Sequence, residues 1–472
     1  MKTIDKLYIN GEWTNSNSME TIEVINPATE KPCVCVPKGN HEDVNAAVKS
    51  ARQTFYSWAN TPAVKRAELM NAVADEMQRR TADLIDAHVI TMGCPRHLVA
   101  GLHVDEPIAA MRYYADRAKI MDKIQEKNGV LLFKEPIGVC VFISPWNYPL
   151  HQLIGKVAPA LAAGCTMVAK PSGQTPLQDF IMAQIFEAVG LPAGVFNLVS
   201  GPGSVIGPIL SSHPSVDMVS FTGSTAAGIK VAAAASPTVK RVCQELGGKS
   251  PYIITKDADL EAAVRYGVED VMLNTGQTCN ALTRMFIHKS CYEKAVTMAR
   301  TIAEENIVGD PNDHDVTMGP MASASQKQIV LNYIKKGLEE GARLVTGGFE
   351  MPSGLDCGAY VRPTIFADVS NEMIISREEI FGPVLCMIVY DDIKTAIEMA
   401  NDTVYGLSSG VYAKNKESAL KIARQIRAGQ CYIQGSYFNI EAPFGGFKQS
   451  GNGREWGDQA MHEYIETKAV IV

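Results

Sequence analysis

Two hydrophobic patterns alternate through the middle of the chain. Short runs that are apolar throughout, such as 139–143, are followed by longer segments whose apolar residues recur every three or four positions. The short runs are typical of parallel strands buried on both faces, and the longer segments of amphipathic helices. Further strands are predicted at 166–169, 195–199 and 216–221, with helices between them that close at Gly164 and Gly190. This alternation predicts an α/β fold with a doubly wound parallel sheet.

Similar patterns flank this region. Residues 7–25 predict short strands, the first clear helix follows Asn40, and Thr61-Pro62 predicts an N-cap with proline at the first helical position. A second α/β unit is predicted after Pro251, and the alternating end of the chain, 464–472, predicts an edge strand. In the second unit we expect strands at 284–288 and 385–390 and helices at 259–273, 291–305, 323–340, 395–400 and 418–426.

The loops that follow the predicted strands are rich in glycine, proline and polar residues. In open parallel sheets, ligands bind at the carboxyl ends of the strands, where these loops lie. The loop 201–207 has one residue more than the common dinucleotide fingerprint, and a loop of this kind taken singly is more often a structural turn than a cofactor site. A second glycine loop, 222–228, follows the next strand, and each loop opens a helix. Two such loops together favour a nucleotide cofactor bound at helix N-termini.

Composition narrows the class of protein. The 472 residues are 46% hydrophobic and 20% charged, as in soluble globular proteins of several domains. A net charge of -7 and the lack of a basic run argue against a nucleic-acid partner. No run approaches the ~18 apolar residues of a membrane helix, and the N-terminus lacks a signal-peptide core. The 11 scattered cysteines predict reduced thiols in a cytoplasmic protein, and the 9 histidines form no metal-ligand cluster, so no metal is expected.

Two stretches carry candidate chemistry. Cys279 follows Gly276 in a polar segment, and Glu245 is followed by the glycine pair 247–248, where the backbone can turn sharply. A cysteine and a carboxylate beside flexible turns suggest a nucleophile and a general base. Each has an ordinary alternative, since most cysteines are small buried hydrophobes and most loop carboxylates are solvated.

With these stretches in place, the chain resembles the aldehyde dehydrogenase superfamily over essentially its whole length. Any one motif occurs by chance, but the ordered set points to this family. The matching motifs are Pro145-Trp146-Asn147, Lys170-Pro171-Ser172, Phe221-Thr222-Gly223-Ser224, Glu245-Leu246-Gly247-Gly248-Lys249, Gly276-Gln277-Thr278-Cys279, Glu379-Ile380-Phe381-Gly382-Pro383 and Pro443-Phe444-Gly445-Gly446-Phe447-Lys448.

The resemblance implies a mechanism. Cys279 would attack the aldehyde carbon, and the Asn147 amide with the Cys279 backbone N–H would stabilise the oxyanion. Hydride would pass to the nicotinamide and leave a thioester, which water activated by Glu245 would hydrolyse. Lys156 and Glu455 match a pair that some members use as a proton route, and a structural ion pair is the alternative. A relative that passes the acyl group to coenzyme A is the alternative function.

The resemblance also implies cofactor contacts. Lys170 would reach the adenosine ribose, Glu379 would hold the nicotinamide ribose, and Ser224 would lie near the pyrophosphate at a helix N-terminus. Many NAD-preferring members have glutamate where this chain has Gly173. NADP can then be accommodated, with Lys170 and Ser172 as phosphate ligands, although NAD is expected to remain the preferred cofactor. Further expected contacts are Ser144, Trp146, Gly203, Gly207, Phe221, Gly223, Leu246 and Phe381.

The substrate pocket is expected to lack a cationic anchor. Relatives that act on carboxylate-bearing semialdehydes can have arginine where this chain has Gly155, and others have tryptophan there. Glycine predicts a roomier pocket, with aromatic walls from Tyr148, Phe438 and Phe444. An uncharged, largely apolar, medium-sized aldehyde is therefore the expected substrate.

Finally, the resemblance implies three parts. An NAD(P)-binding domain would comprise residues 1–117 and 139–248, and a catalytic domain residues 249–450. A small β bridging element, 118–138 with 459–472, would join subunits into a homodimer or homotetramer.

Overall fold

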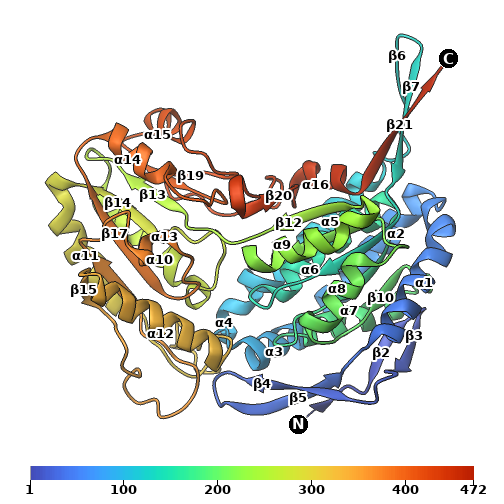
Figure 1. Cartoon of the computed structure of the whole chain (residues 1–472), viewed down its shortest axis with the longest axis horizontal. Helices are drawn as coiled ribbons and strands as arrows, with labels where there is room; N and C mark the ends of the chain where they lie inside the picture. The colour runs from blue at the N-terminus through green and yellow to red at the C-terminus, as the bar shows by residue number, and fades with distance from the viewer. Residues whose placement is uncertain (1) are drawn as a thin grey trace.

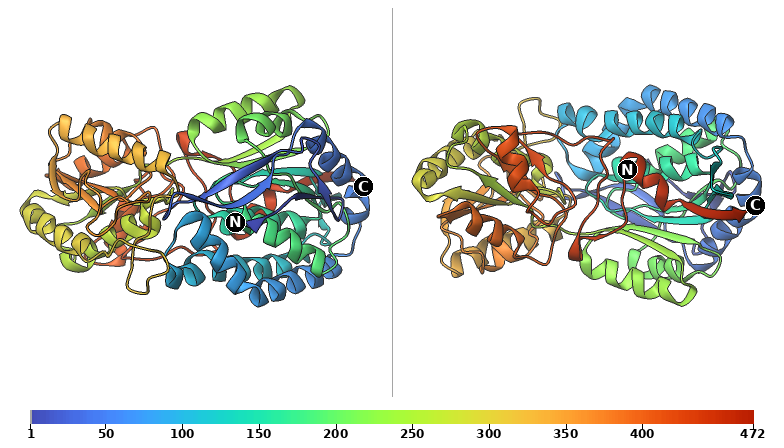
Figure 2. Two further views of the ribbon diagram at one scale, coloured as in Figure 1. Left: turned by 90° about the horizontal axis from the view of Figure 1, so that it is seen from below. Right: turned by 90° about the horizontal axis from the view of Figure 1, so that it is seen from above.

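The computed structural model describes residues 2–472. Two α/β units lie side by side, and a narrow three-stranded sheet projects from the first of them (Figures 1 and 2). Among the described residues, no helix is both long and apolar enough to span a bilayer.

The first unit is built on an eight-stranded sheet. Its strand order is β20-β12-β11-β8-β9-β10-β2-β3, and the five strands from β12 to β10 are parallel. The strands are β2 Lys6–Ile9, β3 Glu12–Asn15, β8 Val139–Ile143, β9 Thr166–Lys170, β10 Phe196–Leu198, β11 Met218–Thr222, β12 Arg241–Glu245 and β20 Gly451–Asn452.

Helices cover both faces of this sheet, which confirms the doubly wound prediction. Along β8, Val139 and Val141 pack on one face, whereas Cys140 and Phe142 pack on the other. The first face is covered by α1 His41–Ala59, α8 Gly203–Ser212 and α9 Thr225–Ala235. The second is covered by α2 Ala63–Arg79, α3 Thr81–Met92, α5 Asp105–Ala118, α6 Pro149–Ala163 and α7 Leu177–Ala188. The short α4 Arg96–Val99 and a π-helical turn, Ala100–Val104, lead into α5.

The second unit is a seven-stranded sheet in the order β15-β16-β17-β14-β13-β18-β19. All neighbouring strands are parallel except β15 and β16. Its strands are β13 Pro251–Ile254, β14 Arg284–His288, β15 Arg343–Thr346, β16 Thr364–Ala367, β17 Val384–Tyr390, β18 Gly410–Tyr412 and β19 Tyr432–Ile433. Its helices are α10 Leu260–Met272, α11 Tyr292–Glu304, α12 Ala324–Glu339, α13 Ile374–Arg377, α14 Ile393–Asn401 and α15 Lys416–Ala423.

Two small antiparallel sheets complete the fold. The projecting sheet has the order β21-β7-β6, so the terminal strand lies at an edge, as predicted. Its strands are β6 Gln125–Lys127, β7 Val130–Pro136 and β21 Ile465–Ile471, and the short α16 Gly457–Glu463 precedes β21. The other small sheet joins β1 Lys2–Thr3, β5 Lys31–Pro37 and β4 Thr21–Asn26. The domain boundaries expected above stay a prediction.

One predicted helix start was wrong. The second helix begins at Ala63 with Pro62 in the N-cap position, and no side chain caps it. The Thr61 hydroxyl donates instead to the carbonyl of Ser57 at 3.0 Å. The Thr61 hydroxyl therefore caps the end of α1, whereas the sequence pattern assigned it to the start of α2.

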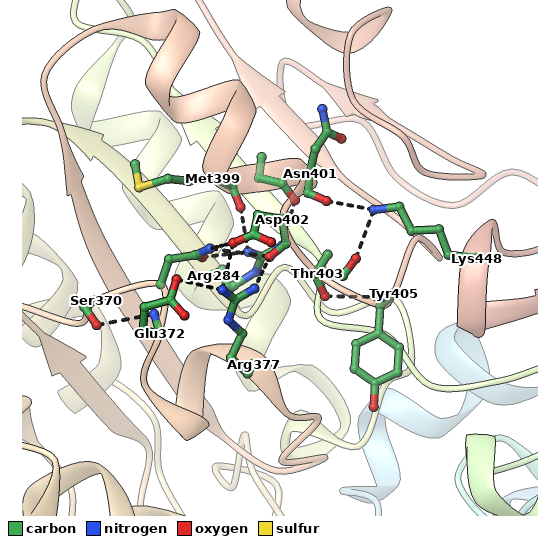
Figure 3. A network of polar contacts seen from close by, with 12 residues as sticks. Arg284, Ser370, Glu372, Arg377, Met399, Asn401, Asp402, Thr403, Tyr405 and Lys448 are labelled. Carbon is green, nitrogen blue, oxygen red and sulfur yellow. Dashed lines mark hydrogen bonds and ion pairs between the residues drawn. The ribbon is translucent and has the colours of Figure 1, made fainter.

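A buried arginine fixes the segment that leaves the first unit and enters the second. Arg284 is fully buried at the start of β14, and its guanidinium donates to the carbonyls of Lys249 at 3.0 Å and Ala400 at 2.9 Å. Nearby, Lys448 donates to the carbonyls of Asn401 at 2.8 Å and Thr403 at 3.1 Å (Figure 3). These contacts tie the loop after β12 and the loop around Lys448 to the end of α14.

Candidate active site

Cys279 lies where two cavities meet. It contributes to the lining of one cavity of about 270 Å³ and of a second of about 180 Å³. The first is lined mainly by loops at the carboxyl ends of the first sheet, and the second mainly by aromatic residues of both units. A half-buried thiol between two cavities can meet one molecule from each side.

The loop that carries Cys279 has a constrained backbone. Asn274 and Thr275 both have positive φ angles, of 54° and 57°. Left-handed backbone costs about 1–3 kcal/mol for residues other than glycine, and it collects at functional sites. Gly276 is required, since a Cβ there would lie 2.1 Å from the carbonyl carbon of Gly382. The loop is thereby pressed against the segment that carries Glu379 and Phe381.

Asn147 is held against this loop. Its side-chain amide donates to the carbonyl of Gln277 at 2.9 Å, and its own carbonyl accepts from Asn274 at 3.0 Å. Asn147 is buried directly before α6, in the loop that follows β8. The amide therefore lies beside the cysteine loop, where a donor to a developing oxyanion is needed.

Glu245 ends β12 and projects into the cavity of about 270 Å³. It is 3% exposed, and neither carboxylate oxygen has a hydrogen-bond partner among residues 2–472. Burial raises the pKa of Glu245 well above its ordinary value, and the Glu455 carboxylate raises it further. A Cβ at Gly445 would lie 2.7 Å from the carboxylate, so glycine keeps this space open. A buried, unpaired carboxylate with a raised pKa is suited to accept a proton.

Lys156 and Glu455 form a buried ion pair close to Glu245. The Lys156 Nζ lies 2.6 Å from Glu455 Oε1 and donates to Thr222 Oγ1 at 2.7 Å. Thr222 pairs directly with Glu245 across β11 and β12. The second oxygen of Glu455 has no partner among the described residues. The structure thus brings these two predicted residues together with the candidate base.

The surroundings of Cys279 favour the thiol form of its sulfur. Burial raises the pKa of Cys279 above its ordinary range, and the carboxylates of Glu379 and Glu245 raise it further. Because a thiolate is the reactive nucleophile, the thiol has to lose its proton before it attacks a carbonyl. Glu245 lines the same cavity and is the candidate acceptor for that proton.

Six of the predicted cofactor contacts line the cavity of about 270 Å³. Glu379 accepts from the backbone N–H of Gly248 at 2.9 Å, and burial raises the pKa of Glu379 to about 7. Ser224 caps α9, so the free N–H groups of that helix start lie at the cavity. Predicted residues that line this cavity are Trp146, Asn147, Gly223, Ser224, Glu245, Leu246, Cys279, Glu379 and Phe381.

The other predicted cofactor residues lie outside this cavity. Lys170 ends β9 beside β8, and burial lowers the pKa of Lys170 to about 8. A Cβ at Gly173 would meet no atom within 4 Å, so a larger group fits there. Gly203 and Gly207 lie within α8, where an added Cβ would also be unobstructed. Ser144, Ser172 and Phe221 are the remaining predicted cofactor residues outside the cavity. That any of these residues binds the cofactor stays a prediction.

These residues fit a dinucleotide. Ser144 Oγ is buried without a partner in the described chain, and the Lys170 amine donates to the carbonyl of Pro171 at 2.6 Å. Groups of this kind gain a partner when a polar ligand binds. Glu379 and the start of α9 lie at the inner end, in the cavity that Cys279 shares.

Three of the four predicted pocket residues line the cavity of about 180 Å³, and their role in substrate binding stays a prediction. Tyr148, Phe438 and Phe444 line it, whereas Gly155 does not. A Cβ at Gly155 would lie 3.0 Å from the indole ring of Trp456. The missing side chain therefore makes room for Trp456 rather than for substrate.

Sequence reasoning missed most of this cavity. The rings of Trp456 and His151 pack at a tilt with centroids 4.3 Å apart, and the ring centroid of Phe438 lies 5.4 Å from that of Trp456. Neither Trp456 nor His151 belongs to a motif that the sequence analysis used. Other missed lining residues are Leu102, Glu106, Tyr266, Asp270, Tyr432 and Tyr437 here, and Gln326 and Tyr333 in the cavity of about 270 Å³.

Comparison with known proteins agrees with this geometry. Residues 13–470 match the model of the aldehyde dehydrogenase family. The chain is 46% identical to 3-succinoylsemialdehyde-pyridine dehydrogenase from Pseudomonas sp., over 100% of this chain and 99% of that protein.

Two solved structures are similar throughout. One is a mutant of aldehyde dehydrogenase C from Pseudomonas syringae in complex with NAD+ and octanal. It has a TM-score of 0.97 and 43% identity, covering 99% of this chain and 96% of that one. The other is an aldehyde dehydrogenase from Mycobacterium tuberculosis with NAD+, at a TM-score of 0.97 and 39% identity, covering 100% and 98%. With the cysteine, amide and carboxylate motifs gathered at one site, the chain belongs to the aldehyde dehydrogenase family.

Proposed function

We propose that this enzyme oxidises an aldehyde to the free carboxylic acid with NAD, through a covalent intermediate on Cys279. The observation that supports this most strongly is the position of Cys279 between two cavities, with Glu245 unpaired in one of them. One cavity suits a dinucleotide and the other an apolar aldehyde, so both reactants reach the same sulfur.

The first step forms the Cys279–carbon bond. Glu245 takes the thiol proton, the sulfur attacks the carbonyl carbon, and the carbonyl oxygen becomes the oxyanion of a thiohemiacetal. The Asn147 amide and the Cys279 backbone N–H donate to that oxyanion, and losing one such donor typically costs about 3 kcal/mol in the barrier. NAD, when bound, supplies the hydride acceptor that turns this adduct into a thioester.

The second step cleaves the thioester with water. Glu245 removes a proton from the water, whose oxygen attacks the acyl carbon and releases the acid and the Cys279 sulfur. Lys156 and Glu455 are proposed to carry the proton onward from Glu245, and the 2.6 Å contact between them supports this. A coenzyme A acceptor is the alternative, and the buried carboxylate of Glu245 argues against it because it favours hydrolysis.

NAD is the proposed cofactor, and NADP a weaker one. Both similar structures described above hold NAD+. The open space at Gly173 leaves room for a 2′-phosphate, and no carboxylate at that position would repel it.

The proposed substrate has an apolar body and no carboxylate. The similar structure from P. syringae contains octanal, and the relative from Pseudomonas sp. is named for a pyridine-bearing semialdehyde. Aromatic rings dominate the walls of the substrate cavity, and no lysine or arginine lines it among the described residues. A carboxylate on the substrate would therefore lack a partner.

The enzyme is also proposed to be a cytoplasmic homodimer or homotetramer. Ile471 and Val472 are 85% and 74% exposed at the end of the projecting sheet, as expected of a strand that a second copy covers.

The test is an aldehyde panel with NAD and NADP supplied separately. We expect NADH formation with apolar aldehydes, the free acid as product, and no activity in Cys279→Ala. An acyl-coenzyme A product, formed only when coenzyme A is present, would replace the hydrolytic proposal. Cofactor reduction that persists in Cys279→Ala would exclude the proposed nucleophile.

A further inference from the structure

The substrate cavity has an acidic side that the proposed reaction does not use. Glu106, near the start of α5, lines it together with Asp270, near the end of α10. Glu106 accepts from or shares a proton with His151 Nε2 at 3.1 Å, and its side chain remains 37% exposed. Asp270 accepts from the backbone N–H of Leu282 at 2.8 Å. Each carboxyl group is thus held in place through one of its two oxygens.

Glu106, Asp270, Cys279 and Tyr432 line the same cavity. Asn280, the residue after Cys279, donates to the Tyr432 hydroxyl at 3.2 Å. Burial raises the pKa of Tyr432, and the carboxylates of Asp270 and Glu106 raise it further. The cavity therefore holds the reactive sulfur, Tyr432 and two carboxyl groups.

Aromatic rings surround these carboxyl groups. Tyr266 and Tyr437 have ring centroids 6.0 Å apart, and the Tyr266 hydroxyl donates to the carbonyl of Ser436 at 2.8 Å, which fixes its ring. Among residues 2–472, His151 is the one basic side chain in the lining, and it already contacts Glu106. Lys156, on the same helix, is held in its own ion pair with Glu455.

We propose that Glu106, with Asp270, makes the enzyme select aldehydes that carry a cationic nitrogen at the end remote from the carbonyl. Aromatic faces and carboxylates both attract cations, and the attraction is stronger where water is excluded. An apolar linker would lie along Tyr148, Phe438 and Phe444, between the aldehyde and the nitrogen. This inference rests on the proposed oxidation. It changes the expected substrate from an aldehyde with an uncharged remote end to one whose remote end is positively charged.

The test compares two aldehydes of the same shape. One is butanal with a terminal trimethylammonium group, and the other carries a tert-butyl group in its place. We expect the wild-type enzyme to prefer the ammonium aldehyde in kcat/KM by about tenfold or more. Glu106→Gln should reduce that preference at least severalfold, mainly through KM, and Asp270→Asn should reduce it while keeping an acceptor for Leu282.

Asp105→Asn is the matched control. It removes the same charge from the same turn of α5, but Asp105 is exposed and lies outside the cavity lining, so the preference should persist. Equal kcat/KM values for the two aldehydes in the wild type, or a preference unchanged in Glu106→Gln, would overturn the inference while leaving the oxidation intact. Failure of both aldehydes, and of every aldehyde in the panel, would instead refute the proposed function.

Discussion

The two cavities that meet at Cys279 differ in what lines them. On the cofactor side, loops at strand ends contribute backbone donors, two carboxylates and a helix start, namely through Glu245, Glu379 and Ser224. On the substrate side, ring faces from α6, α10 and the segment 432–456 make a large part of the wall, and Glu106 and Asp270 add two carboxyl groups. The cofactor side therefore presents the groups that act on the reacting atoms, whereas the substrate side presents the shape and charge that select the aldehyde.

This difference separates two tasks. Bond-making chemistry needs a donor and a base within hydrogen-bond reach of fixed atoms, so it depends on a few residues. Discrimination between aldehydes depends on the summed contacts of many side chains, each worth a few kcal/mol at most. Substitutions on the two sides should accordingly have separable effects.

The largest effect is expected from Asn147→Ala. Loss of the oxyanion donor should lower kcat by about 10²–10³-fold for short and long aldehydes alike. The Kd for NAD should stay unchanged, because the chemistry rather than the cofactor is affected. Stopped-flow measurement of NADH formation with two aldehydes of different length checks this. A loss of activity confined to one aldehyde would show that Asn147 contributes to substrate recognition rather than to oxyanion stabilisation.

Phe438→Ala should act on the other side. Removing a ring that packs against Trp456 and His151 should lower kcat/KM for a long apolar aldehyde by about 10–100-fold, as expected for lost aromatic contacts. Acetaldehyde, which is too short to need this wall, should be affected far less. Steady-state kinetics with both aldehydes provide the measurement, and an equal loss for both would show that the ring supports the catalytic loop instead.

Gly173→Glu should change only the choice of cofactor. Space for the side chain is present, and the added carboxylate should accept from the ribose hydroxyls and repel a 2′-phosphate. We expect the NAD to NADP ratio of kcat/KM to rise about tenfold, from a charge effect of one to two kcal/mol. Gly173→Gln has nearly the same size without the charge and should leave the ratio close to that of the wild type. A ratio raised equally by both variants would indicate shape rather than charge.

The smallest effect concerns stability. Glu245 has a raised pKa in the folded enzyme, so the unfolded chain loses this proton at lower pH than the folded one does. Folding is therefore weakened as the pH rises from about 5 towards 7, by at most about 1.4 kcal/mol per pH unit. Glu245→Gln should raise Tm, and the gain should grow over that range. Glu455→Gln, which leaves Lys156 without its ion pair, should lower Tm instead.

The contrast between the two cavities also explains which site residues could be predicted from the sequence. Cys279, Glu245 and Asn147 stand in short contiguous motifs, so the local sequence pattern is enough to identify them. Gly155 was misread because Trp456, which fills the space above it, comes from a distant part of the chain. Glu106 and Asp270 sit on ordinary amphipathic helices, and only the packing of α5 and α10 around Cys279 shows that they share a cavity.

Strand β12 was missed for a related reason. Its sequence, Arg241 to Glu245, has polar residues at three of five positions and gives no apolar run. Parallel pairing with β11 makes it a strand, and that pairing places Glu245 beside Thr222 at the carboxyl edge. Long-range pairing of this kind leaves no local signal.

The most direct test of the account is the time course of NADH formation by Glu245→Gln after rapid mixing with aldehyde and NAD. Other bases, including water, can accept the thiol proton more slowly. We therefore expect one equivalent of NADH per active site, followed by turnover at least about tenfold slower than in the wild type, as loss of a general base implies. A thioester on Cys279 should accumulate and be visible by mass spectrometry of the quenched enzyme. Steady-state turnover equal to that of the wild type, with no acyl group on Cys279, would contradict the role of Glu245.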